Sequence, residues 1–209
     1  MDCIVDFDST IYFGNYLQND TNGDGDVNEL DSKDPIEWEV LSVEDGKVLL
    51  MSVMNIDARE FDIRSNVTWK NSELRTWLNQ TFFNTAFSIN EQSAIIDNTI
   101  VTKGEVLLGT EDISTTDKVY VPSYQDVINP EYGFDYEEYE DSSRLAFNTH
   151  YTATKAGMFA GGESDVYWLR NNGQDGNLMA VTMYGALMYQ MPTDTVCGIR
   201  PMILVDANK

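Results

Sequence analysis

The sequence predicts a single α+β domain, because strand-like segments lie at both ends of the chain and helical segments lie between them. The segments in which apolar residues alternate or cluster as in β-strands are 10–16, 37–43, 47–53, 118–121, 167–169, 179–181 and 199–205. The chain has 209 residues, of which 42% are hydrophobic, so it can bury a sizeable core. Since single domains commonly reach this length, we expect one domain over 1–209.

The first three strands are expected to form a meander. A long connection rich in Asp, Asn and Gly joins 10–16 to 37–43. The turn Glu44-Asp45-Gly46 then leads into 47–53, an apolar run typical of a buried strand.

One helix of about three turns is predicted from Asn71. Its apolar residues recur at spacings of three, four and one, which places them on a single broad stripe. They are Leu74, Trp77, Leu78, Phe82 and Phe83.

Two pairs of residues match the capping box, in which each side chain bonds the backbone N–H of the other residue. Ser88 and Glu91 predict the start of a short helix whose core face includes 94–96. Ser123 and Asp126 predict a third short helix in the same way.

The segment 131–141 alternates six carboxylates with four aromatic residues. This composition is too charged for a core, so we expect an exposed loop or insertion there. Gly173, Gly176 and Gly185 are expected in the turns between the C-terminal strands.

The charge of the chain restricts its partners. The formal net charge is -22 and the sequence pI is near 4.1, so phosphate backbones and anionic lipids are repelled. No segment approaches the roughly 18 apolar residues that a membrane helix needs. We therefore expect neither nucleic acid nor membrane insertion, and cations are the natural partners.

Residues 20–31 (DTNGDGDVNELD) match the twelve-position calcium loop of EF-hands, with oxygen side chains at positions 1, 3 and 5, glycine at 6 and a carboxylate at 12. The expected Ca²⁺ ligands are Asp20, Asn22, Asp24, Asp26 through its backbone carbonyl, Asn28 and Asp31. Val27 would face the core. Neither flank reads as a helix, so we expect an isolated calcium loop on a connection between strands. The alternative is a solvated loop of Asx turns without metal.

Other chemistry is only weakly indicated. The single His150 excludes a three-His zinc site, and nothing local marks Cys197 as a catalytic thiol. Cys3 and Cys197 either form a disulfide between the chain ends or remain two buried thiols. Trp168 precedes Arg170 and a polar, glycine-rich turn, so it is a candidate for lining a ligand surface.

Six short motifs, in order, resemble those of the bacterial domain-of-unknown-function family 6273, whose members are mostly secreted or surface proteins. The motifs occupy 11–18, 35–41, 68–87, 116–123, 167–171 and 197–205. The family is similar to C-type-lectin-like domains, including those of formylglycine-generating enzymes, in which the C-terminal strand pairs near the N-terminal one. The resemblance implies that Gly198, Arg200 and Pro201 lie on that closing strand. It also implies an extracellular or cell-surface location, with a leader removed.

We therefore expect a C-type-lectin-like domain with the calcium loop inserted between its N-terminal strands. The expected function is non-catalytic, calcium-dependent recognition of a glycan or protein at the bacterial surface. The ligand would lie near Trp168, Arg170 and Asn172. The alternatives are a relative of the formylglycine-generating enzymes, which would need a reactive thiol, and a structural cell-surface spacer.

Overall fold

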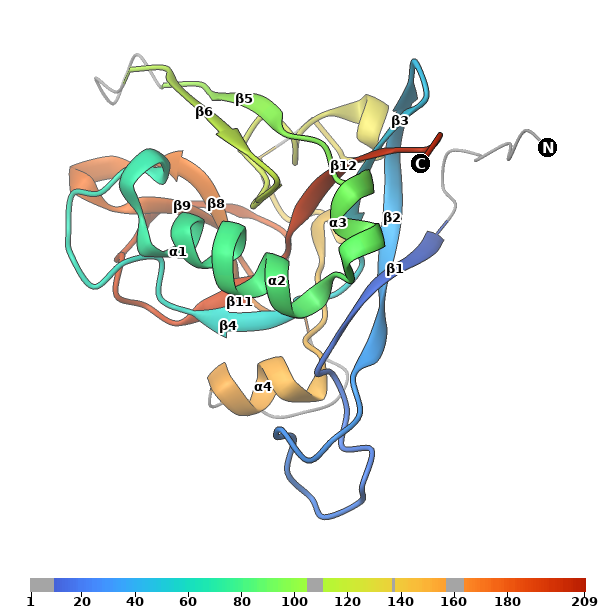
Figure 1. The fold of residues 1–209 in the computed structure, drawn as a ribbon. Coiled ribbons are helices and arrows are strands. Elements are labelled where there is room, and N and C mark those ends of the chain that lie inside the picture. The colour runs from blue at the N-terminus through green and yellow to red at the C-terminus, as the bar shows by residue number, and fades with distance from the viewer. Residues whose placement is uncertain (1–9, 105–110, 137, 157–163) are drawn as a thin grey trace.

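The computed structural model describes residues 10–104, 111–136, 138–156 and 164–209. The fold is mixed α+β, as predicted, with most residues of regular structure in sheets and a few short helices between them (Figure 1). Two sheets have five strands each, and a two-stranded hairpin lies beside them.

The first sheet joins the two ends of the described chain. In spatial order its strands are β1 (Thr10–Tyr16), β2 (Asp34–Glu44), β3 (Lys47–Ser52), β12 (Met202–Asp206) and β7 (Val119–Tyr120). The predicted meander of the first three strands is confirmed. The C-terminal β12 pairs antiparallel with β3, from Met202 opposite Met51 to Asp206 opposite Lys47.

The second sheet is formed mainly by the last third of the chain. Its strands are β10 (Leu187–Met191), β9 (Leu178–Val181), β8 (Tyr167–Asn172), β11 (Cys197–Ile199) and β4 (Asp57–Arg59), and the separate hairpin consists of β5 (Asn98–Thr102) and β6 (Ile113–Asp117). The predicted strand over 199–205 is interrupted at Arg200 and Pro201. Gly198 therefore lies on β11, paired with β4 and β8, and not on the strand that closes the first sheet.

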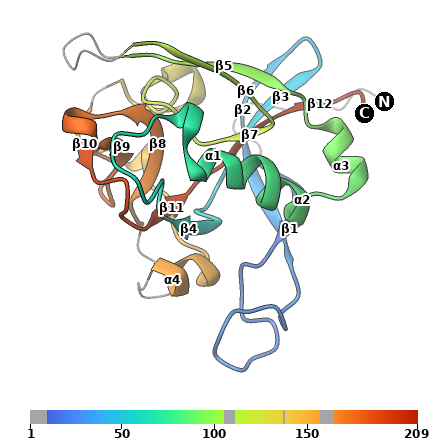
Figure 2. The ribbon, with the colours of Figure 1, turned by 60° about the vertical axis from the view of Figure 1, so that its left-hand side comes forward.

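The helix predicted from Asn71 is confirmed as three consecutive helical pieces. They are α1 (Glu73–Trp77), a π-helical turn η2 (Leu78–Phe82) and α2 (Phe83–Ala86), preceded by the short 3₁₀ helix η1 (Trp69–Asn71). The stripe is buried at Leu74, Leu78 and Phe82, whereas Trp77 is half-buried at its edge. Figure 2 shows this helical segment between the strands of the two sheets.

The two capping boxes have different outcomes. Ser88 and Glu91 cap α3 (Ile89–Ala94) reciprocally, as predicted. Ser123 and Asp126 also bond each other's backbone N–H, but only turns follow, so the third helix is wrong. Tertiary contacts hold that segment, because the N–H of Tyr124 bonds Asn171 and the carboxylate of Asp126 pairs with Arg170.

The remaining helices were not predicted. They are α4 (His150–Ala156) and the 3₁₀ turns η4 (Pro130–Tyr132), η5 (Ser142–Arg144) and η6 (Gln174–Gly176). No described helix has both the length and the apolar character needed to span a membrane.

The main core lies between the two sheets and the α1 to α2 segment, and a smaller core covers the other face of the second sheet. Strand β8 contributes to both, because successive side chains of a strand point to opposite faces. Trp168 packs in the main core, while Tyr167 and Leu169 pack in the smaller one. The first three side chains of the 167–171 motif therefore point alternately into the two cores, and all three are buried.

Candidate functional site

The loop between β1 and β2 projects from the body of the domain, at the lower end of Figure 1. Its side-chain oxygens hold its own backbone. The carboxylate of Asp20 accepts hydrogen bonds from the N–H of Gly23 (2.6 Å) and of Gly25 (2.8 Å). Asn22 and Asp24 each accept from the N–H two residues later, at 2.8 and 3.0 Å. These are Asx turns, and they curl the loop tightly.

Asp31 closes the loop from its last position. One carboxylate oxygen accepts from the N–H groups of Thr21 (2.8 Å) and Asn22 (3.1 Å), and the other accepts from Asn28 (2.9 Å). These bonds, with that from Asn28 as the largest cause, hold the pKa of Asp31 below its usual range. Val27 is buried, but it is part of neither of the two core clusters, so its predicted contact with the core stays a prediction.

The loop has the donor chemistry that Ca²⁺ requires, since all six predicted ligands offer oxygen and Gly25 has the positive φ of 92° that a sharp turn needs. Its carboxylates are turned toward backbone N–H groups. Within the described ranges, no three His, Cys, Asp or Glu side chains lie close enough together to hold a metal ion. Calcium binding therefore stays a prediction, which requires the carboxylates to converge when the cation arrives.

The predicted ligand surface around Trp168 is not formed. Trp168 is 0% exposed, and its indole nitrogen donates to the backbone carbonyl of Arg59 at 2.9 Å. Its ring packs edge-on against Phe61, with 5.5 Å between ring centroids. Because β8 lies inside its sheet with both faces covered, this tryptophan is a core residue.

Arg170 is also buried, at 4% exposure. Its guanidinium donates to the carboxylate of Asp126 (2.8 Å), the carbonyl of Val121 (2.8 Å) and the hydroxyl of Thr102 (3.1 Å). Half-buried Asn172 donates to the carbonyl of Val67 at 3.0 Å. Both side chains connect segments of the fold, so neither offers an open binding surface.

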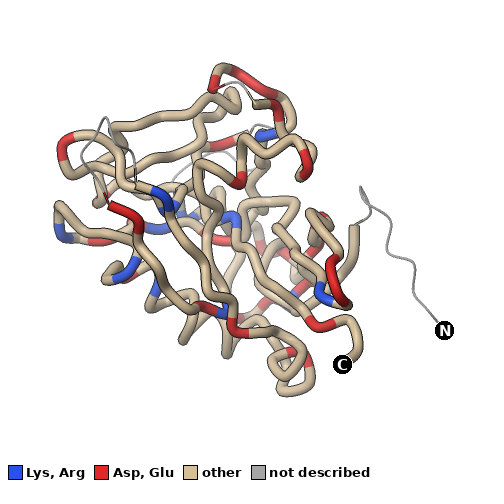
Figure 3. Tube along the Cα trace, turned by 90° about the horizontal axis from the view of Figure 1, so that it is seen from above, with Lys and Arg blue, Asp and Glu red and all other residues tan. Residues whose placement is uncertain are grey.

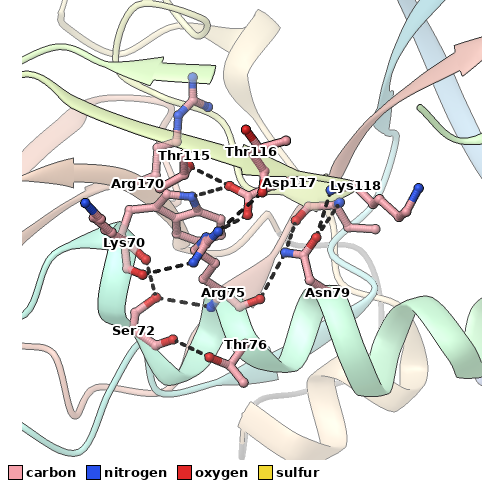
Figure 4. Close-up of polar contacts among 12 residues, drawn as sticks. Lys70, Ser72, Arg75, Thr76, Asn79, Thr115, Thr116, Asp117, Lys118 and Arg170 are labelled. Atoms are coloured by element: carbon pink, nitrogen blue, oxygen red, sulfur yellow. Dashed lines mark hydrogen bonds and ion pairs between the residues drawn. The ribbon is translucent and has the colours of Figure 1, made fainter. Parts of the chain in front are cut away.

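The most specific motif of the sequence, over 68–87, meets the motif over 116–123 in a buried polar network (Figure 4). Asp117 is at its centre and is 2% exposed. Its carboxylate accepts from the indole of Trp69 (3.0 Å), the hydroxyl of Thr115 (2.6 Å) and Nε of Arg75 (2.6 Å). The network fastens α1 to the β5 to β6 hairpin.

Asn79, on the π-helical turn, completes this junction. Its side-chain oxygen accepts from the N–H groups of Lys118 (2.8 Å) and Val119 (3.2 Å), and its amide nitrogen donates to the carbonyl of Val119 (2.8 Å). The amide therefore supplies the hydrogen bonds that a neighbouring strand would give to the edge strand β7. A polar groove of about 350 Å³ opens beside it, lined in part by Arg75, Gln80 and Lys118.

A larger cavity of about 600 Å³ lies where the 140–147 segment meets the turn between β9 and β10. We call it the aromatic pocket, and its lining includes Glu140, Asp141, Leu145, Phe147, Met183 and Tyr184. Tyr184 is 63% exposed and Phe147 is 44% exposed. The sequence analysis did not identify this site.

The neighbouring segment 131–141 carried the only sequence signal for the pocket, which was its alternation of aromatic and acidic residues. The expected exposure is confirmed at Tyr136 and Tyr139. It is wrong at Phe134, which is buried in the main core.

Cys197 is buried in β11 and has no disulfide partner among the residues that the structure describes. Burial, and to a lesser extent the nearby carboxylate of Asp165, raises the pKa of its thiol to about 12. Cys3 lies outside the described residues, so its proposed pairing is a prediction only. A thiol with so high a pKa is a poor nucleophile at neutral pH.

Figure 3 shows that Asp and Glu occur along the whole described trace, with few Lys and Arg among them. Several of the few arginines are engaged inside the protein. Arg144 and Arg200, like Arg170, are buried and bonded to backbone carbonyls. These three arginines are therefore not available to bind anions at the surface.

Comparison with known proteins identifies a family. The model of the family described as Domain of unknown function (DUF6273) matches residues 45–207, more than three quarters of the chain. The matched range contains the 68–87 motif but begins after the 20–31 loop. No curated protein and no solved structure matches the chain. The chain belongs to the DUF6273 family.

Proposed function

We propose that this protein is a non-catalytic, calcium-binding recognition module of the bacterial cell surface. The observation that carries the proposal is the 20–31 loop, which has oxygen side chains at the positions of an EF-hand calcium loop and is already curled by Asx turns. Its closing residue is Asp31 where EF-hands usually carry Glu, a substitution that resembles the calcium loops of dockerin modules. An extracellular site of this type binds calcium at roughly 10⁻⁴ to 10⁻³ M.

Calcium would order the loop and the elements that it joins. Without a cation, the carboxylates of Asp20, Asp24 and Asp31 repel one another within a short segment. The base of the loop is tied to the body through Gln18, which donates to the carbonyls of Asp34 (3.0 Å) and Pro35 (2.9 Å). The carbonyl of Gln18 accepts from the N–H of Tyr151 on α4. A bound ion would therefore stabilise native structure on both sides of the loop.

A C-type-lectin-like arrangement is part of the proposal. It is supported by the pairing of β12 with β3, which places the C-terminal strand inside the N-terminal sheet. Formylglycine-generating chemistry is the less favoured alternative, because the one described cysteine is buried and protonated at neutral pH. A structural spacer would have no specific ligand.

Thermal unfolding of the chelator-stripped protein tests the calcium site. Millimolar Ca²⁺ should raise the Tm more than Mg²⁺ does, because a ligand that binds only the native state stabilises it. Asp24→Ala should abolish the shift. Glu29→Ala is the matched control, since it removes the same charge from a position of the loop that is not a predicted ligand. Equal shifts in both variants, or no shift in the parent protein, would refute the site.

A further inference from the structure

We propose that the aromatic pocket binds a lysine or arginine side chain on a basic segment of a partner protein. This inference rests on the proposed recognition function and names its partner class. The juxtaposition that carries it is a cavity of about 600 Å³ that combines exposed aromatic rings with carboxylates.

The aromatic rings are unusually accessible. Tyr184 and Phe147, both in the lining, are 63% and 44% exposed. Large aromatic side chains normally bury most of their surface, so a group of exposed rings around a cavity marks an interaction site. The faces of such rings attract ammonium and guanidinium groups.

The backbone that presents these rings is held from beneath by Arg144. This side chain is 0% exposed, and its guanidinium donates to the carbonyls of Gly185 (2.6 Å), Tyr139 (2.6 Å) and Asp135 (2.9 Å). It therefore ties the 135–141 side of the pocket to the turn that carries Tyr184.

Backbone bonds add to this anchoring. The N–H of Asp141 donates to the carbonyl of Tyr184 at 3.3 Å, and the N–H of Leu187 donates to the carbonyl of Glu138 at 3.0 Å. A pocket whose backbone is fixed before binding loses little conformational entropy when a ligand enters.

The charge of the lining selects a cation. Glu140 is exposed and forms no hydrogen bond or ion pair with any residue that the structure describes, and the pocket lining contains no Lys or Arg. The carboxylate of Asp141 is already used by the N–H of Ser143 (2.9 Å) and by Arg144 (3.3 Å). Glu140 is thus available to pair with an incoming positive charge, and the net charge of -22 attracts basic segments toward the protein.

A glycan is less well matched to this lining. The lining offers no side-chain amide, and the hydroxyl of Ser164 already donates to the carbonyl of Met183, so Ser142 and Tyr184 are the lining side chains left to donate to sugar hydroxyls. Acidic ligands would be repelled by Glu140.

The test is a calorimetric titration of the full chain with the capped peptide Gly-Lys-Lys-Gly and the matched peptide Gly-Gln-Gln-Gly. The lysine peptide should bind and the glutamine peptide should not. Tyr184→Ala and Glu140→Gln should each weaken binding about 5- to 10-fold, and Tyr184→Phe should bind like the parent. Tyr12→Ala and Glu131→Gln are the matched controls, since both residues are exposed and lie outside the lining.

Three outcomes would overturn the proposal. Equal weakening by the control variants would show diffuse attraction by the acidic surface. Binding of the glutamine peptide as strongly as the lysine peptide would exclude cation recognition. Binding of a neutral oligosaccharide, displaced by Tyr184→Ala, with no binding of the lysine peptide would assign the pocket to glycans. Each titration is repeated in chelator and in Ca²⁺, so a failure of the calcium loop is distinguished from a failure of the pocket.

Discussion

Nε of Arg75 lies 2.6 Å from a carboxylate oxygen of Asp117, although 42 residues separate the two in the sequence. The contact joins α1, within the 68–87 motif, to the end of β6, where the 116–123 motif begins. Trp69 and Thr115 donate to the other oxygen of the same carboxylate. Trp69, Arg75 and Asp117 are thus bonded to one another, and these contacts stabilise the packing of the helical segment against the hairpin.

Asp117→Ala should destabilise the protein by about 3 kcal/mol, because it leaves Nε of half-buried Arg75 and the indole N–H of buried Trp69 without an acceptor. Urea denaturation measures this change. Asp97→Ala is the control, since Asp97 forms an exposed ion pair with Lys118 at 3.4 Å. It should change the free energy of unfolding by less than about 0.5 kcal/mol. Similar losses in the two variants would contradict the structural role of Asp117.

Gly14→Ala should destabilise the protein by about 2 kcal/mol or more. Gly14 lies at a bulge of β1 with φ of 73°, and an added Cβ would lie 2.6 Å from the ring of Phe87. Its N–H also donates to Glu91, at 2.9 Å. Gly133→Ala separates the two causes, because Gly133 has φ of 83° but open space around its Cα. Gly133→Ala should lower the free energy of unfolding by only about 1 kcal/mol. If the two variants were destabilised equally, the Phe87 ring must move away from the added Cβ, and the predicted clash would be refuted.

The Asp62 carboxylate should give the protein part of its resistance to acid. Arg64, through its side chain and its N–H, and the N–H of Glu73 hold the pKa of Asp62 below its usual range. Because the unfolded state binds the proton at higher pH, this stabilisation is complete above about pH 4 and is lost as pH falls through the lower, folded pKa.

Asp62→Asn should therefore be less stable than the parent at pH 7, by about 1 kcal/mol, and the difference should shrink in acid as the pH falls through the lowered pKa of Asp62. Urea denaturation at pH 7 and over a series of acid pH values measures it. The control is Asp135→Asn, which changes an exposed carboxylate and should have the same free energy of unfolding as the parent at neutral and at acid pH. If the difference in stability between Asp62→Asn and the parent stayed constant with pH, the cause would be disturbed packing around the amide and not the loss of the negative charge.

Cys197 should be almost inert in the native protein. In a Cys3→Ser variant, a disulfide reagent at pH 8 should label Cys197 more than about 100-fold more slowly in buffer than in urea, because the thiol is buried and its pKa is raised to about 12. Labelling in buffer at the rate of an unfolded cysteine would contradict the buried position. It would also revive the thiol-enzyme alternative.

Local patterns predicted the elements whose signals lie within a few residues. The stripe from Leu74 to Phe83 predicted the helix, and Ser88 with Glu91 predicted the start of α3. The same pattern at Ser123 and Asp126 predicted a helix that does not form. The two reciprocal bonds are made, but only turns follow, and the contact with Arg170 helps to hold the segment in that conformation. Strand β4 has only three residues and carries little local signal, since its partner β11, far along the chain, defines it.

The candidate sites divide in the same way. The 20–31 loop is visible in sequence because a calcium loop supplies its ligands from consecutive positions. The aromatic pocket is not visible, because Glu140, Phe147 and Tyr184 meet only after the chain has folded. Trp168 and Arg170 show the opposite error. Their residue types are suited to binding, so the sequence predicted a ligand surface, but their place in a central strand buries them.

The sequence by itself determined the α+β class, the meander, the central helix and the acidic character, since each depends on composition or on short-range periodicity. It also determined the family, through the resemblance of its ordered motifs. Only the tertiary structure decided that Gly198 and Met202 lie in different sheets, that Asp117 is a buried anchor, and which aromatic rings remain exposed. The physical reason is that burial and long-range hydrogen bonding are set by which strands become neighbours. That choice depends on the packing of the whole chain at once.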